Sequence, residues 1–190
     1  KMDFLGLRNL TVLDDARKMI LSGGGQLDWD HLDYDDPAVF DMLGKGQTSG
    51  VFQMESSGMT DVAVRLKPRS IEDVTAIIAL FRPGPMQYID DYIRCSKDPS
   101  AVHYAHPLAK VLSVTYGCIV YQEQVMEIFR LLAGYSLGKA DMVRRAMSKK
   151  KLDVLKAERE SFVRGNPAEG ICGCAANGVP EDVANGIFDQ

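Results

Sequence analysis

Apolar residues recur at the three- and four-residue spacing of an α-helix along most of this chain. Between positions 121 and 133 they are Val125, Ile128, Phe129, Leu132 and Ala133, which form one stripe on a helix. Such a stripe is typical of a helix that packs against a core. The same spacing predicts helices over ten segments: 11–21, 37–43, 58–66, 71–81, 86–95, 107–114, 121–133, 138–148, 152–164 and 180–189. The pattern therefore predicts a mainly α fold.

Capping residues and one rigid break set the ends of several of these helices. Asp36 precedes a proline, which suits an N-cap followed by the first helical position. Ser70 with Asp73 three residues later predicts a capping box in which aspartate replaces glutamate. The RPGP segment at 82–85 predicts a rigid break, because its two prolines fix φ and remove hydrogen-bond donors.

Three segments lack helical spacing. The opening residues, KMDFLGL, alternate in polarity and predict a short N-terminal β segment. The segment TSGVFQM at 48–54 is short and β-leaning, so it could be a strand or an extended link. The segment GNPAEGICGCAANG at 165–178 is rich in glycine and small residues, which predicts a mobile loop.

Asp3 is a carboxylate inside an apolar run. A buried, unpaired carboxylate is costly, so such a group is usually paired, solvated or bound to a cation. The local pattern alone favours a surface strand whose alternate residue faces water. A functional role for Asp3 stays open at this point.

Charge is unevenly distributed along the chain. The formal net charge is −4, yet ten basic and four acidic residues between Arg130 and Gly165 give that stretch a charge of +6. A basic block on an acidic chain indicates a local phosphate or nucleic-acid contact more than a general polyanion surface. A solvated helix face is the alternative.

Cysteine usage and the absence of long apolar runs predict a cytoplasmic protein with free thiols. Four cysteines show no disulfide-framework spacing, and no apolar run approaches the roughly 20 residues of a membrane span. Neither the Cys172–Cys174 pair nor the His103–His106 pair has convincing spacing for a zinc site. The first and last residues both read as interrupted elements, so we expect a fragment of a longer protein.

VRRAMSKKK, at 143–151, is the most informative stretch of the basic block. On a helix, Arg144 and Arg145 cover neighbouring faces, and Arg145 lies four residues before Lys149. Like charges at that spacing cost a few tenths of a kcal/mol, which an anion bound between them would offset. Arginine offers a planar fork for phosphate, and lysine a flexible point charge. A solvated helix end, favoured by the macrodipole, explains the spacing equally well.

Six motifs in one order carry a resemblance to a known family. They are KMDFLGLRNLTVLDDA, VFQMESSGM, ALFRPGPM, TYGCIVYQEQVMEI, LAGYSLGKADMVRRAMSKKK and the closing IFD. Together they resemble the C-family of bacterial replicative DNA polymerases, the alpha subunits of DNA polymerase III. The resemblance implies that residues 1–22 are the C-terminal edge of a palm domain, with a metal-site strand and the helix after it. Residues 23–190 would be a helical fingers domain, truncated at its C-terminal side.

The resemblance also assigns site residues. Asp3 would be the third of three catalytic aspartates that hold two Mg²⁺ ions, and Lys1 would lie near the nucleotide. Arg144, Arg145 and Lys149 would bind the triphosphate of the incoming nucleotide, with Arg82 as a secondary contact. The family's other two aspartates form a D-x-D motif upstream. The DWD triplet at 28–30 matches those letters but lies downstream, so we reject it.

The resemblance implies a DNA-directed DNA polymerase, a nucleotidyltransferase, as the parent protein. Its partners would be primer–template DNA, deoxynucleoside triphosphates (dNTPs) and other replicase subunits. Among these is the sliding clamp, reached through regions outside this chain, and no membrane is involved. The fragment alone is expected to be inactive and to hold no Mg²⁺. The alternative is a non-catalytic helical module that binds nucleic acid or a protein partner, and a salt titration would separate the two.

Overall fold

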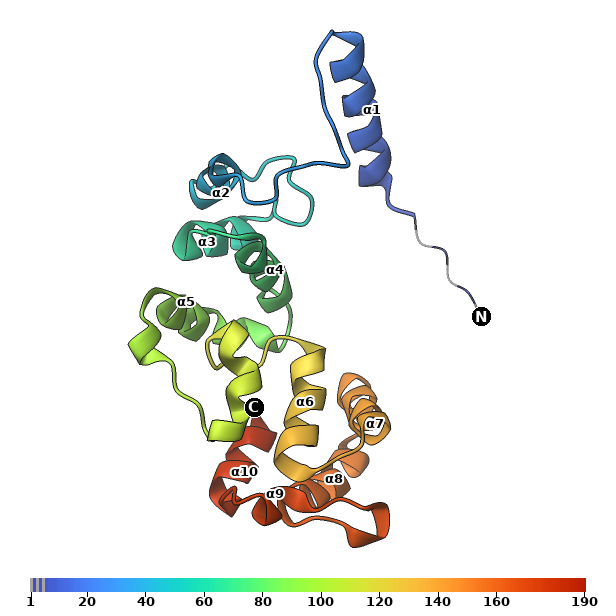
Figure 1. Ribbon diagram of the computed structural model, residues 1–190, viewed down its shortest axis with the longest axis vertical. Helices are drawn as coiled ribbons and strands as arrows, with labels where there is room; N and C mark the ends of the chain where they lie inside the picture. Colours follow the sequence, from blue (N-terminus) through green and yellow to red (C-terminus); the bar gives the residue numbers. More distant parts are fainter. Residues whose placement is uncertain (1, 3, 5) are drawn as a thin grey trace. The chain divides into compact units, whose positions relative to one another are not determined.

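The computed structural model describes residues 2, 4 and 6–190, and their fold is mainly α-helical. The chain divides into a first unit, Lys1–Val74, and a second, Thr75–Gln190 (Figure 1). The only β pairing in the described part of the chain is one isolated antiparallel bridge, Asn166 to Ile171. The predicted α fold is therefore confirmed. None of the described helices is both long enough and apolar enough to cross a membrane.

The N-terminal β segment is not seen. Met2, Phe4, Gly6 and Leu7 belong to no strand, and residues 1, 3 and 5 lie outside the described residues. A strand is stabilised by ladder hydrogen bonds to a neighbouring strand, and the described residues supply no sheet for this segment to join.

The first unit contains α1 (Arg8–Ser22), α2 (Pro37–Gly44) and α3 (Ser57–Leu66), and α4 (Ile71–Leu80) carries the boundary with the second unit. Asp36 caps α2 as predicted, with its Oδ1 accepting from the N–H of Ala38 at 2.8 Å. One half of the predicted box at α4 forms, since Ser70 Oγ accepts from the N–H of Asp73. The Asp73 carboxylate accepts from the N–H of Arg69 at 2.9 Å, one residue before the position that a capping box uses.

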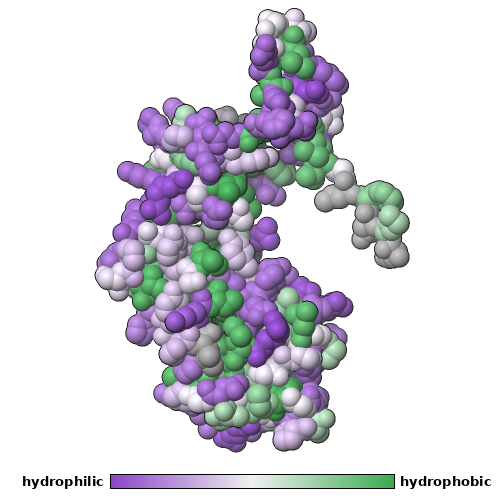
Figure 2. Space-filling view, in the orientation of Figure 1, coloured by the Kyte–Doolittle hydropathy of each residue, from purple (hydrophilic) through white to green (hydrophobic). Residues whose placement is uncertain are grey.

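The small core of the first unit lies between α2 and α3. Its buried side chains are Phe40, Leu43, Met54, Met59, Val62, Ala63 and Leu66. Residues 48–54 form turns and no strand, and Gln53 adopts φ 63°. This segment contributes Met54 to the core. By contrast, α1 has no buried residue, and Figure 2 shows apolar side chains exposed among hydrophilic ones on this helix.

The second unit begins within α4 and continues through six further α-helices and four 3₁₀ segments. They are η1 (Pro85–Tyr88), α5 (Ile89–Lys97), η2 (Pro99–Ala101), η3 (Pro107–Thr115), α6 (Gln122–Ala133), α7 (Leu137–Ser148), α8 (Leu152–Arg164), η4 (Pro167–Glu169), α9 (Gly173–Ala176) and α10 (Glu181–Asp189). Among these, α9 spans a single turn. The segment predicted as a helix at 107–114 adopts the tighter 3₁₀ form.

The core of the second unit is built around α6, which packs against α7, α8 and α9 (Figure 1). The apolar stripe predicted on α6 faces this core, because Phe129 is 3 % exposed and Leu132 is fully buried. The rings of Phe129 and Phe162 lie 4.7 Å apart between centroids. This packing holds α7, and with it the basic stretch, in a fixed position within the unit.

Residues 165–178 pack against the core and do not form the mobile loop that their composition predicted. Ile171 and Cys174 are buried in the main cluster, and Asn166 exchanges two backbone hydrogen bonds with Ile171. Asn177 Nδ2 donates to the carbonyl of Leu132 at 2.9 Å, at the C-terminal end of α6. The segment therefore provides a hydrogen-bond donor to a carbonyl in the last turn of α6, where carbonyl groups have no partner within the helix.

Candidate functional site

A buried polar network fixes the backbone just before α6. Gln124, 4 % exposed, accepts hydrogen bonds from the N–H groups of Val120 and Tyr121, each at 2.9 Å. Its Nε2 donates to Thr115 Oγ1 at 2.7 Å, and Thr115 in turn donates to the carbonyl of Cys118 at 2.6 Å. Because these buried groups satisfy one another, residues 118–122 are held in one conformation.

The predicted break at residues 82–85 is also rigid. Gly84 adopts φ 108° and ψ −84°, a conformation that a side chain would make strained. Pro85 then begins η1, and the N–H of Met86 donates to the carbonyl of Arg82 at 3.1 Å. The turn thereby fixes the backbone of Arg82, which lies two residues after the end of α4.

Two adjoining hollows lie in the second unit around these segments. The first, of about 610 Å³, includes Arg82 in its lining, and the second, of about 250 Å³, includes Arg144. The two hollows share four of their lining residues, which are Pro85, Val120, Tyr121 and Gln122. The structure therefore brings two of the predicted contact residues, 62 positions apart in the sequence, to either side of one wall.

Arg144 is anchored on two sides. Its Nε and Nη2 donate to Asp141 Oδ1 at 2.9 and 2.7 Å, and its Nη1 donates to Gln122 Oε1 at 2.6 Å. The side chain is 25 % exposed. A guanidinium has five N–H donors, so these bonds leave two for a ligand.

Arg145 and Lys149 lie outside both hollows. Arg145 is 67 % exposed, and its Nη2 lies 2.6 Å from Asp141 Oδ2. Lys149 is exposed at the C-cap of α7. Lys1 and Asp3, the other two predicted site residues, lie outside the described residues.

Some cations of the basic block, residues 130–165, form ion pairs with carboxylates, and these pairs reduce the positive charge that a ligand could meet. Lys139 lies 2.6 Å from Glu158 Oε1 and 2.7 Å from Glu169 Oε2, and both contacts raise its pKa against the opposing effect of burial. Four cations of the block pair with carboxylates other than Asp141: Arg130, Lys139, Arg159 and Arg164. The excess positive charge therefore concentrates at the end of α7.

The carboxyl group of Asp141 is held in its ionised form. Hydrogen bonds from Arg144 lower its pKa, and the charges of both arginines add to this effect against burial. With one anion between two cations, the local net charge is +1. The arrangement can attract a further anion such as a phosphate.

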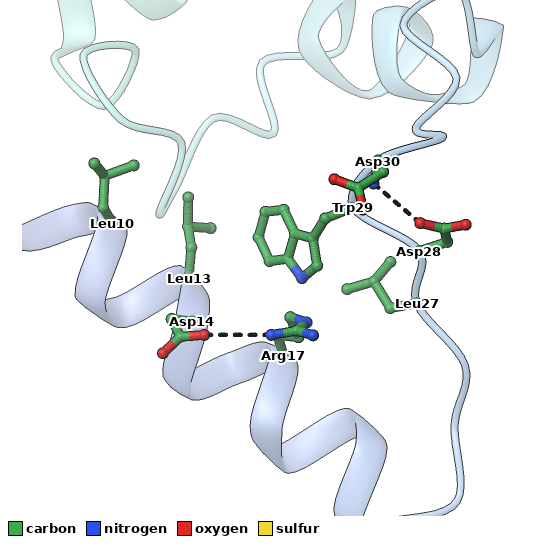
Figure 3. A pocket seen from close by; sticks show the side chains of 8 residues that line it. All are labelled: Leu10, Leu13, Asp14, Arg17, Leu27, Asp28, Trp29 and Asp30. Atoms are coloured by element: carbon green, nitrogen blue, oxygen red, sulfur yellow. Dashed lines mark hydrogen bonds and ion pairs between the residues drawn. The ribbon is translucent and has the colours of Figure 1, made fainter.

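A third hollow, of about 400 Å³, lies between α1 and residues 27–30 of the first unit. Figure 3 shows the Trp29 indole facing α1 beside Arg17, with carboxylates from Asp14, Asp28 and Asp30 around it. Three carboxylates against one guanidinium would repel a phosphate. Asp28 accepts from the N–H of Asp30 at 3.0 Å, as in a local turn. This hollow is therefore a poor nucleotide site.

No metal centre is formed among residues 2, 4 and 6–190. They contain no group of three or more His, Cys, Asp or Glu side chains that could hold a metal ion. The described residues therefore do not fit a resident Mg²⁺ site by themselves.

The sequence did not identify Tyr121 and Gln122 as site residues, because no local pattern indicates that either contacts a ligand. The structure places both on the shared wall of the two hollows, and Gln122 contacts Arg144 across 22 positions of sequence. Helical periodicity reports only neighbours three or four residues apart, so this pairing gave no local signal.

Comparisons with known proteins agree with this architecture. A family model described as the bacterial DNA polymerase III alpha subunit finger domain matches residues 9–170. DNA polymerase III subunit alpha of Thermus aquaticus is 49 % identical over 197 residues, and that of Caulobacter vibrioides is 46 % identical over 190. The corresponding subunit of Staphylococcus aureus strain COL is 44 % identical over 191 residues.

These matches cover the whole of this chain but a small part of the relatives. The chain spans 16 % of the Thermus and Caulobacter proteins and 17 % of the Staphylococcus protein. With the family model matching most of its length, the chain belongs to the bacterial DNA polymerase III alpha subunit finger domain family.

Proposed function

We propose that this chain is the fingers region of the catalytic subunit of a bacterial replicative DNA polymerase. It binds the incoming dNTP and the primer–template during template-directed DNA synthesis. The observation that carries the proposal is the pair of hollows on either side of residues 120–122, with Arg82 on one and Arg144 on the other. The family match supports it independently.

The reaction of the longer protein is a nucleotidyl transfer. The primer 3′-hydroxyl gives up its proton to solvent, and its oxygen forms a P–O bond with the α-phosphorus of the dNTP. The bond from that phosphorus to the α–β bridging oxygen breaks, and pyrophosphate leaves with the electron pair. Such a transfer depends mainly on positioning and on stabilising negative charge. In this proposal the chain contributes both, by binding the triphosphate with cationic side chains fixed on a packed helix.

Each predicted contact residue has a physical role in the proposal. Arg144 presents its remaining N–H donors to a phosphate from the wall of the smaller hollow. Arg145 and Lys149 add positive charge from the exposed end of α7, where they are weaker and more easily screened. Arg82 approaches from the larger hollow as a secondary contact.

Asp3 and Lys1 are proposed on resemblance alone. Asp3 would provide one catalytic and metal-ligating carboxylate in the longer protein, and Lys1 would lie near the nucleotide. Carboxylate oxygens suit Mg²⁺, which usually also keeps several waters and binds substrate phosphates. Further ligands would have to come from outside this chain.

The division into domains is likewise a proposal. Residues 1–22 would form the edge of the palm and residues 23–190 the fingers, and this boundary coincides with the end of α1 at Ser22. The finger-domain match begins earlier, at residue 9 within α1. In the cytoplasm, contacts with the sliding clamp and other replicase subunits would use regions outside this chain.

Calorimetric titration of this chain with dATP and with dAMP, at several salt concentrations, tests the proposal. A triphosphate site predicts binding of dATP about tenfold or more tighter than dAMP, because each additional phosphate meets further cationic donors. Equal affinities for the two nucleotides would contradict it. Binding of DNA alone, weakening linearly in log–log form with several released counterions, would instead indicate a module that contacts the nucleic-acid backbone.

A further inference from the structure

One carboxylate on α7 joins the two arginines of the proposed triphosphate site. Asp141 Oδ1 accepts from Arg144 Nε and Nη2 at 2.9 and 2.7 Å, and its Oδ2 lies 2.6 Å from Arg145 Nη2. The three residues lie on adjacent turns of the same helix. Asp141 is 27 % exposed, so its bonds with Arg144 are partly shielded from water.

The contacts of Arg144 define the direction of its guanidinium. Asp141 binds the side that carries Nε and Nη2, and Gln122 binds Nη1 at 2.6 Å. Gln122 belongs to the first turn of α6, directly after the backbone that Gln124 fixes. Two elements thus hold one planar group, which lines the 250 Å³ hollow and has two N–H donors that Asp141 and Gln122 do not use.

Two opposite effects follow from an acidic residue at this place. By charge alone, Asp141 reduces the attraction of α7 for an anion, because it lowers the local charge of the two arginines from +2 to +1. By geometry, it removes rotamer freedom from Arg144 before a ligand arrives. A long side chain that is already ordered does not have to lose that freedom on binding.

We propose that Asp141 is a positioning residue for the triphosphate: it orients the Arg144 guanidinium toward the smaller hollow, and this orientation outweighs the negative charge it adds. The inference rests on the proposed function and identifies the residue that orders the Arg144 side chain before the triphosphate binds. It makes a prediction opposite to that of simple electrostatics, in which removal of an acid would tighten the binding of an anion.

Calorimetry with dATP on this chain, comparing wild type with Asp141→Asn, tests the inference. Asp141→Asn is expected to weaken dATP binding about fivefold, because a neutral amide oxygen accepts from Arg144 more weakly than a carboxylate and leaves the side chain less ordered before binding. Asp153→Asn is the matched control, because it removes one acidic charge from an exposed position on the neighbouring helix α8. The control is expected to bind dATP within about twofold of wild type, or slightly more tightly.

A double-mutant cycle shows whether Asp141 acts through Arg144. In an Arg144→Ala background, Asp141→Asn is expected to change dATP affinity by less than about twofold. A role confined to helix stability would shift the thermal unfolding midpoint and leave no coupling in the cycle. Gln122→Met removes the other anchor without altering charge, and it is expected to weaken binding in the same direction even if Asp141→Asn folds poorly.

The outcomes separate this inference from the proposed function. If wild type binds dATP and Asp141→Asn binds equally or more tightly, the inference is overturned and the triphosphate site stands. An equal loss in the wild-type and Arg144→Ala backgrounds also overturns it. If wild type itself shows no preference for dATP over dAMP, the proposed function fails, and this inference fails with it.

Discussion

Basic side chains close together in the sequence have different roles in this chain. Lys139 and Arg144 both belong to the basic block, yet Lys139 is shared by Glu158 and Glu169 while Arg144 lines a hollow. The sequence predicted that Arg144 and Arg145 cover neighbouring faces of a helix. It could not predict that Lys139 pairs with Glu158 or that Arg144 contacts Gln122, because both partners come from other helices.

Gly134→Ala is expected to destabilise the chain by about 2 kcal/mol or more. Gly134 caps α6 at φ 74°, and a Cβ there would lie 2.2 Å from Cys172 Sγ. Both the left-handed backbone and the contact oppose a side chain. Urea unfolding measures the change in the free energy of unfolding.

The matched variant is Gly134→Ala combined with Cys172→Ala. Removing the sulfur relieves the contact, so the double variant is expected to recover part of the loss and to retain about 1 kcal/mol of backbone strain. No loss in Gly134→Ala would show that this contact between α6 and residues 165–178 is not formed.

Helical elements were the most predictable level of this structure. Local sequence signals predicted where helices begin: Asp36 caps α2, and Ser70 accepts from the N–H of Asp73 at the start of α4. The segment at 165–178 was mispredicted because glycine content was taken as a sign of mobility. Ile171 and Asn177 instead find their partners in distant helices, which no local pattern reveals.

Lys150→Gly is expected to stabilise α7 by about 0.5–1 kcal/mol. The helix ends in a Schellman motif, in which the N–H of Lys151 donates to the carbonyl of Ala146 and that of Lys150 to Met147. Lys150 adopts φ 51°, a left-handed conformation that glycine enters at less cost.

Urea unfolding of Lys150→Gly measures this gain. Lys156→Gly, at an exposed position inside α8, is the control and is expected to lose about 1 kcal/mol, because glycine is unfavourable within a helix. A loss of similar size at Lys150 would contradict the assigned end of α7.

Tertiary contacts, which no local pattern specified, decide how the chain as a whole responds to pH. Burial raises the pKa of the Cys118 thiol to about 11 and that of the Cys174 thiol to about 12. In the unfolded chain these thiols return to their ordinary pKa near 9.0. The folded state therefore keeps protons that the unfolded state releases as the pH rises.

The free energy of unfolding is thus expected to be highest below pH 9 and to fall as the pH rises through about 11. Guanidinium unfolding at intervals from pH 8 to about 11 measures the slope. Cys118→Ala combined with Cys174→Ala removes both thiols and is expected to give a shallower fall over the same range. Equal slopes in the two proteins would show that other groups control the alkaline response.

The central claim is that the end of α7 binds a triphosphate. The most direct measurement is calorimetric titration of dATP, at low salt, into wild type and into Arg144→Ala/Arg145→Ala/Lys149→Ala. The control is Lys97→Ala/Lys110→Ala/Lys156→Ala, which removes three exposed positive charges that line neither hollow. We predict that binding is lost in the α7 variant and kept in the control. Equal binding by wild type and the α7 variant would contradict the claim and identify the basic helix end as solvated surface.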